Sequence, residues 1–123
     1  MQIKNKKEMT KEFKVRLYSF VINLINTLDT VPSNRLSNRI IDQLVRSSTS
    51  ILGNYIEGTS SSSKKEYINY FQISLKSANE SKVWLAILRD THRLSKDVAE
   101  QFLSELDELS KIFASSVLTL KGK

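Results

Sequence analysis

The chain is 123 residues long and 40% apolar, and it contains three Gly, one Pro and no Cys. That length suits one domain with one core, and so few Gly and Pro residues exclude a sandwich or barrel, which needs a turn signal about every 8–12 residues. The lack of Cys excludes disulfide frameworks and thiolate metal sites, and the single His excludes a His-rich metal centre. The apolar runs are too short for a membrane span or a signal peptide, which favours a cytoplasmic protein with no membrane partner.

Nineteen Lys and Arg residues outweigh thirteen Asp and Glu residues, giving a net charge of +6. The surplus is concentrated in residues 1–32 and 59–94, each with six basic and three acidic residues. A basic surplus is typical of proteins that neutralise nucleic-acid phosphates. The alternative is that the charge serves only solubility.

The chain begins with a predicted basic arm, residues 1–11, which precedes a single bundle domain at residues 12–121. The first helix is predicted over residues 12–29, where apolar residues recur at the spacing of one helix face. Pro32 then interrupts the pattern. The apolar face of this helix consists of Phe13, Leu17, Phe20, Val21, Leu24 and Leu28.

The second helix is predicted over residues 33–57. Gly58 is expected to end it, because glycine accepts the left-handed conformation that closes many helices. The Thr/Ser tract at residues 59–63 is predicted to be a loop. The residues expected to be buried from this helix are Leu36, Ile40, Leu44, Ile51 and Tyr55.

Ser63 begins a capping box at the start of a third predicted helix, residues 64–91. Its core line contains small residues that would let a neighbouring helix approach closely: Tyr67, Phe71, Ser74, Ala78, Ser81 and Leu85. Ser95 is the predicted N-cap of the fourth helix. That helix is expected to bury Val98, Phe102, Leu106, Leu109, Phe113 and Val117 or Leu120.

Four amphipathic segments joined by short links predict an all-α, antiparallel, up-down-up-down four-helix bundle. The first three helices also carry a second apolar row, and large apolar patches usually mark an interface. We therefore expect a homo-oligomer, although a small bundle that buries wide arcs would account for the same pattern. The expected subunit contacts are Tyr18, Ile22, Ile25, Ile73, Trp84 and Ile87.

Clustered cations are the candidate nucleic-acid contacts. Those of the N-terminal arm continue into the first helix, and those of the third helix follow an i, i+7, i+11 spacing. In the second helix, Arg46 belongs to a similar line but is as well explained by a salt bridge to Asp42. The candidates are Lys4, Lys6, Lys7, Lys11, Lys14, Arg35, Arg39, Lys82, Arg89 and Arg93.

No combination of residues indicates catalysis. Glu57 and Glu80 have no His or Cys partner, so hydrogen bonding at helix ends or across the bundle is the expected role of both. The serines at 47, 48 and 50 have no base nearby and are expected to be packing residues. We expect a protein that is not an enzyme and needs no cofactor or metal.

Two stretches, QLVRSSTSILGNYIEG at 43–58 and KEYINYFQISLKSANES at 65–81, resemble the bacterial "four helix bundle protein" family, whose founding members are encoded in intervening sequences of the 23S ribosomal RNA gene. The resemblance runs from about Phe13 to Leu120. The chain departs from the family pattern at three positions, with Leu52 in place of a common Pro, Tyr55 in place of Ile, and Lys76 in place of Gly. The matching motifs are Gln43-Leu44, Arg46-Ser47, Ser50-Ile51, Asn54, Glu57-Gly58, Lys65-Glu66 and Ser77-Ala78-Asn79-Glu80.

The resemblance implies a non-enzymatic homopentamer associated with nucleic acid, RNA or DNA. A distant branch, the accessory variability proteins of diversity-generating retroelements, pairs with a reverse transcriptase. The alternative function is therefore a protein-binding adaptor, such as an accessory partner of a reverse transcriptase. A shared bundle does not decide between these branches, because function resides in sites rather than in folds.

Overall fold

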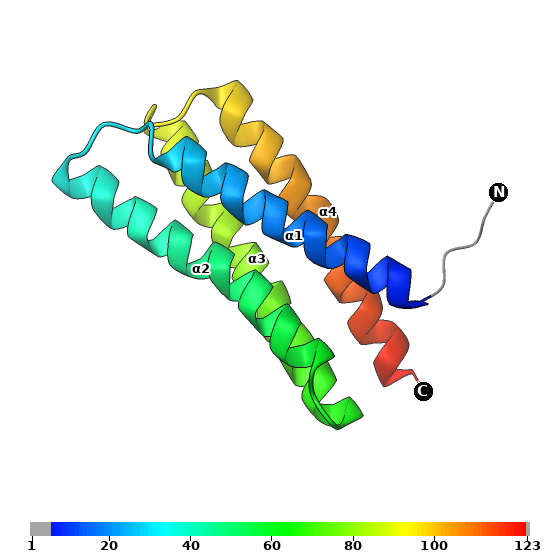
Figure 1. Cartoon of the computed structure of the whole chain (residues 1–123). Coiled ribbons are helices and arrows are strands. Elements are labelled where there is room, and N and C mark those ends of the chain that lie inside the picture. The colour runs from blue at the N-terminus through cyan, green and yellow to red at the C-terminus, as the bar shows by residue number, and fades with distance from the viewer. Residues whose placement is uncertain (1–5, 123) are drawn as a thin grey trace.

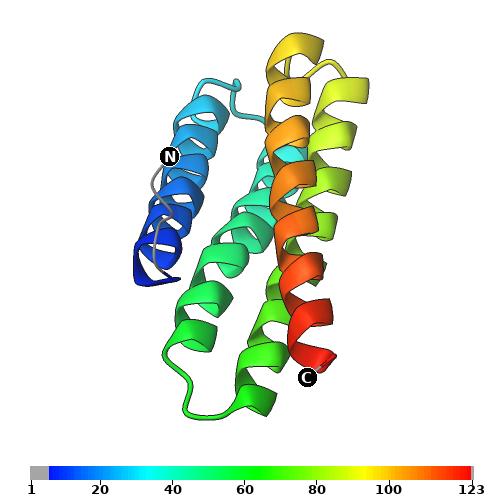
Figure 2. The same cartoon turned by 90° about the vertical axis from the view of Figure 1, so that its right-hand side faces the viewer.

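The computed structural model describes the chain from residue 6 to residue 122, with side chains from residue 11 onward. It contains four helices, α1 (Lys6–Leu28), α2 (Arg35–Thr59), α3 (Lys64–Asp90) and α4 (Lys96–Lys121), and no strand within the described residues. The prediction of an all-helical, four-helix chain is confirmed. The α2–α3 link lies at one end of the molecule with the start of α1 and the end of α4, and the other two links lie at the opposite end (Figures 1 and 2).

Helix α1 begins earlier than the sequence pattern indicated. The expected arm at residues 1–11 is wrong for residues 6–11, which form the first turns of α1. These residues contain neither Gly nor Pro, and most are good helix formers, so the helix extends beyond its apolar face. Lys4 lies outside the described residues, as do the side chains of Lys6 and Lys7.

Side-chain caps fix the starts of the other helices. The Ser63 hydroxyl accepts a hydrogen bond from the Glu66 backbone N–H at 3.1 Å, and Ser95 caps α4 in the same way. Ser63 and Ser95 are therefore confirmed as N-caps, whereas the return bond from the Glu66 carboxylate that would complete the capping box is not among the bonds of the described residues. Asn34, which the sequence analysis missed, accepts from the Ser37 N–H at 2.9 Å. Helix α2 therefore begins at Arg35 rather than at residue 33.

Small residues hold α2 and α3 together. The hydroxyls of Ser47 and Ser81 lie 2.7 Å apart, and the Ser74 hydroxyl donates to the Ile51 carbonyl at 2.9 Å. All three serines are buried, and within the described residues no buried polar side-chain atom lacks a hydrogen-bond partner. The predicted close approach of a neighbour to the small residues of α3 is confirmed.

Gly58 does not end α2, so that prediction is wrong. The residue lies inside the helix, none of the described glycines has a positive φ, and Ser60 is the C-cap. A Cβ at Gly58 would lie 3.0 Å from the Phe71 ring and 3.1 Å from the Cβ of Tyr70. The residue is therefore small because α3 lies against it. Gly53, by contrast, has nothing within 4 Å of its would-be Cβ.

The core is continuous along the bundle and ends in an aromatic cluster. Phe13, Tyr55, Phe71 and Phe113 meet there with ring centroids 5.2–6.2 Å apart. Of the predicted core residues, Leu36 is wrong: it is 58% exposed, because in the first turn of α2 it is the neighbouring Ser37 that faces the core.

Helix α3 ends in a left-handed residue that is not glycine. His92 has φ 60°, and its N–H donates to the Arg89 carbonyl. The Arg93 N–H donates to the Leu88 carbonyl at 2.9 Å. This pair of bonds is the Schellman arrangement, which turns the chain sharply toward α4.

The two helical glycines of α2 should respond oppositely to one added methyl group. We expect Gly53→Ala to raise the free energy of unfolding by about 0.5–1 kcal/mol, since alanine is the better helix former and meets open space. We expect Gly58→Ala to lower it by about 1 kcal/mol or more, because the methyl group overpacks the contact with Phe71. Urea unfolding measures both, and equal effects would contradict the close approach of α3.

Burial of Tyr55 should make stability depend on pH in the alkaline range. The side chain is 3% exposed, and burial, followed by the nearby Tyr67, raises the pKa of Tyr55 to about 12. The unfolded chain releases this proton near pH 10. The contribution of protonated Tyr55 to the free energy of unfolding is therefore complete below pH 10. It is lost as pH rises to 12, by up to about 2–3 kcal/mol. Urea unfolding across this range should show the slope, and Tyr55→Phe should flatten it.

Candidate nucleic-acid interface

The predicted basic line on α3 is engaged within the protein. Lys82 Nζ lies 3.5 Å from Asp107 of α4, and Arg89 Nε lies 2.9 Å from Asp90. Arg93 is not on the helix, which ends at Asp90, and its Nε donates to the Ser37 hydroxyl at 2.7 Å. The expectation of a continuous basic line on α3 is therefore wrong, because α3 ends before its third member and acids neutralise the other two.

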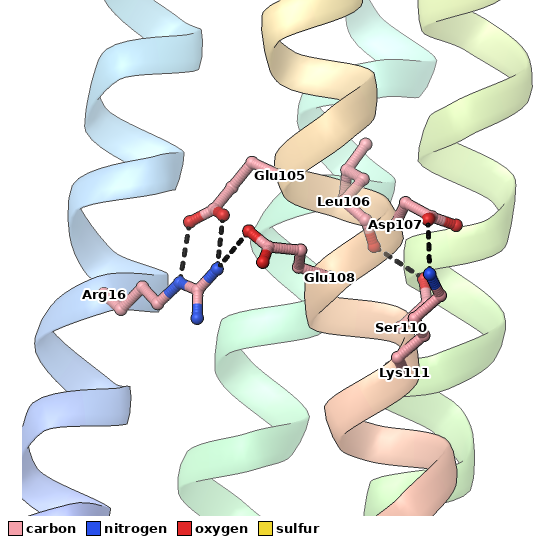
Figure 3. A network of polar contacts seen from close by, with 7 residues as sticks. All are labelled: Arg16, Glu105, Leu106, Asp107, Glu108, Ser110 and Lys111. Carbon is pink, nitrogen blue, oxygen red and sulfur yellow. Dashed lines mark hydrogen bonds and ion pairs between the residues drawn. The ribbon is translucent and has the colours of Figure 1, made fainter.

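Acidic residues of α4 bind several of the remaining cations (Figure 3). Arg16 of α1 donates to Glu105 from both Nε and Nη2, at 2.9 and 2.6 Å, and also to Glu108. These contacts, the Glu105 hydrogen bond above all, raise the pKa of Arg16. Hydrogen bonding to Lys111, with a smaller contribution from Lys82, lowers the pKa of Asp107. This side of the molecule therefore carries balanced charge.

On α2, Arg35 and Arg39 are exposed, and no carboxylate within residues 11–122 pairs with either. Arg46 is also exposed and unpaired there, so the suggested salt bridge to Asp42 does not form. These arginines follow one face of α2, but Asp42 lies among them. The line thus has a net charge of only +2.

The charge of the described side chains divides unevenly between the two ends of the bundle. We define the basic end as residues 11–16, 48–77 and 109–122, which surround the α2–α3 link. It contains eight Lys or Arg and three Asp or Glu residues, a net charge of +5. The other half, residues 17–47 and 78–108, contains seven basic and nine acidic residues, a net charge of −2.

Six lysines of the basic end have no carboxylate partner within the described part of the chain. Lys11 and Lys14, which the sequence predicted as contacts, are exposed on α1. The other four were missed, because residues 63–66 were interpreted only as a helix cap and the chain order hides how the ends of the four helices meet. The six are Lys11, Lys14, Lys64, Lys65, Lys76 and Lys121.

Two open hollows adjoin three of these lysines. One, of about 930 Å³, is lined by Lys64, Lys65 and Lys121, by one acid, Glu66, and by Ser63, Ile68, Asn69, Gln72 and Leu120. The other, of about 860 Å³, has a mostly hydroxyl lining: Thr59, Ser61, Ser62, Ser63, Tyr67, Ser115, Ser116 and Thr119, with Lys64 and Leu120. Lysines and hydroxyls are frequent phosphate contacts in nucleic-acid complexes.

The six expected subunit contacts fall into two groups. Tyr18, Ile22 and Ile25 of α1 are exposed. Ile73, Trp84 and Ile87 of α3 are half-buried, and Trp84 packs against the core. The indole Nε1 of Trp84 donates to Glu80 at 3.2 Å, so this glutamate bonds along its own helix rather than across the bundle.

The described residues offer no cluster of three His, Asp or Glu side chains that could hold a metal ion. None of the helices, as far as they are described, is long and apolar enough to cross a membrane. Glu57 is exposed on α2.

The four long helices place the chain in the class of small all-helical proteins, and comparison with known proteins identifies its family. Residues 11–115 match the 23S rRNA-intervening sequence protein family, and the chain belongs to it. A solved structure from Bacteroides thetaiotaomicron VPI-5482, a protein of unknown function from the S23 ribosomal protein family, superposes with a TM-score of 0.81 at 26% identity, covering 88% of this chain and 96% of that one. No curated protein matches the chain.

Arg16 should help to hold α1 against α4, because the backbones of these helices come close at few positions and its bonds to Glu105 and Glu108 add to the ring contacts between them. We expect Arg16→Met, which keeps the aliphatic stem, to lower the free energy of unfolding by about 1 kcal/mol, a value already reduced for its partial exposure. Lys96→Met is the control, since Lys96 and Glu100 are exposed and 3.9 Å apart, and it should change stability by less than about 0.5 kcal/mol. Urea unfolding at low and high salt would show the difference, and indistinguishable variants would contradict it.

Proposed function

We propose that the protein is a non-enzymatic, homo-oligomeric nucleic-acid-binding bundle of antiparallel, up-down-up-down helices that acts in the cytoplasm. By its family resemblance the oligomer is a pentamer. The basic end contacts RNA or DNA phosphates, and the opposite end does not. The observation that carries the proposal is the separation of charge, +5 against −2, between the two halves of the described chain.

The residues of the basic end suit phosphates rather than bases. Lysine ammonium groups bind phosphate as point charges, and hydroxyls donate to phosphate oxygens, so neither reads sequence. Within the described residues, the six lysines also have no carboxylate to release before binding, unlike Lys82 and Lys111. We therefore expect affinity that tolerates sequence and falls steeply with salt, as counterion release requires.

Removing two lysines at the basic end should weaken binding. We expect Lys64→Gln/Lys65→Gln to lower affinity for a structured RNA and a DNA duplex, and to reduce the slope of log affinity against log salt by about 1–2. The measurement is fluorescence anisotropy from roughly 50 to 200 mM salt.

The matched control removes the same charge from the other half. Lys82→Gln/Lys96→Gln alters two cations that already face carboxylates, so affinity should change by less than about twofold. Equal losses in both double variants would mean that net charge, not the basic end, governs binding. No binding by the unaltered protein at the lowest salt would overturn the proposal in favour of the protein-binding adaptor.

A further inference from the structure

The solvent face of α1 carries no charge over three turns. Between Leu17 and Leu28 the exposed side chains are Tyr18, Ser19, Ile22, Asn23, Ile25 and Asn26. With Val15, the apolar members are spaced three or four residues apart and so lie along one line, exposed by 37–58%. Charged residues are depleted from the cores of protein interfaces, so this face has the composition of a buried contact.

A second surface with apolar side chains lies on α2 and α3. An open groove of about 420 Å³ between α2 and α3 is lined by Leu36, Arg39, Ile40, Gln43 and Trp84. Leu36 is 58% exposed there. The indole of Trp84 donates a hydrogen bond to Glu80 at 3.2 Å, and together with Leu36 and Ile40 it gives the groove an apolar lining, flanked by Arg39 and Gln43, that suits the side of a helix.

Each of the two surfaces ends in a charged residue, and the two charges are opposite in sign, so they could pair between two copies. Within one copy, each charge lies at the helix end that the helix dipole disfavours. Asp29 follows the C-terminus of α1, where an acid opposes the helix dipole and the last turn holds no basic residue. Arg35 opens α2, whose first turn holds no acid. Neither residue, nor Arg39, forms an ion pair within residues 11–122.

We propose that the uncharged face of α1 docks into the α2–α3 groove of a second copy of the chain, with Asp29 against Arg35 and Arg39 of that copy. The inference rests on the homo-oligomer of the proposed function and assigns its interface. Two different surfaces meet in this contact, so it is heterologous and repeats from copy to copy until a ring closes.

The charges also set the direction of each copy. The end of α1 and the start of α2 lie at the same end of the molecule (Figures 1 and 2). Pairing Asp29 with Arg35 and Arg39 therefore places neighbouring copies side by side, with their long axes pointing in the same direction. All the basic ends then lie on one side of the ring. One nucleic acid can contact the basic ends of several copies at once there, which raises the overall affinity through avidity without new kinds of contact.

Cysteine cross-linking tests the contact, because the chain has no cysteine of its own. The single variants Ile25→Cys and Leu36→Cys are unfolded, mixed, refolded together and treated with a bismaleimide. We expect the mixture to give a cross-linked dimer and neither variant alone to do so. Leu118→Cys on α4, 71% exposed and outside both surfaces, is the control mixed with each.

Two results would overturn the inference. Cross-linking of Ile25→Cys alone, as strong as in the mixture, would mean that two α1 faces pair around a two-fold axis. Cross-linking no stronger than with Leu118→Cys, together with a mass near 14.1 kDa in light scattering, would mean that these surfaces bind no second copy.

Charge reversal tests the register independently of cysteine. Asp29→Arg and Arg39→Asp should each lower the cross-linked fraction several-fold, and the two reversals together should restore it. Lys64→Gln/Lys65→Gln should leave cross-linking unchanged. If docking fails while the salt-dependent binding of nucleic acid survives, only the interface is refuted, so the two proposals fail separately.

Discussion

The close contact of α2 with α3 is the constraint on which the rest of the bundle depends. Hydroxyls replace larger side chains at Ser47, Ser74 and Ser81, and each is satisfied by a bond across or along the helices. Gly58 extends the same contact toward the α2–α3 link. The outer edges of this pair form the groove that Trp84 lines, and its linked end brings Lys64 and Lys65 beside the end of α4.

Helix α1 differs from α2 and α3, because it packs less closely against its neighbours and has two distinct faces. The backbone of α1 approaches α2 more often than α4. Helix α1 is joined to α4 by the bonds of Arg16 to carboxylates and by the ring contacts Phe13–Phe113 and Phe20–Phe102. Its inner face supplies core residues, while its outer face is uncharged and carries a line of apolar side chains beside Ser and Asn residues. A second apolar line is wider than a surface helix usually shows, and it is the observation behind the interface proposed above.

Helical spacing predicted the four helices and most of the core, because burial along a helix follows a fixed period. Helical spacing failed where the environment of a residue depends on another helix or on a turn of the chain. In the first turn of α2 Ser37 and not Leu36 faces the core, Gly58 is small because of Phe71 on another helix, and the turn at His92 removes Arg93 from the line of α3. The basic end was missed for the same reason, since Lys14, Lys65 and Lys121 are far apart in sequence. The ion pairs between helices were missed as well, because the sequence of α3 alone does not show that Asp107 of α4 lies beside Lys82.

The uneven division of charge has a consequence for how the molecule approaches a partner. With +5 at one end of the described chain and −2 at the other, the protein has a large electric dipole moment along its long axis. In the antiparallel arrangement proposed above, the backbone dipoles of the helices largely cancel, so the side chains determine the sign of the moment. In the field of a polyanion a molecule with such a moment experiences a torque before any contact forms. The proposed nucleic-acid partner would therefore meet the protein already oriented, and added salt should slow that encounter as well as weaken the proposed complex.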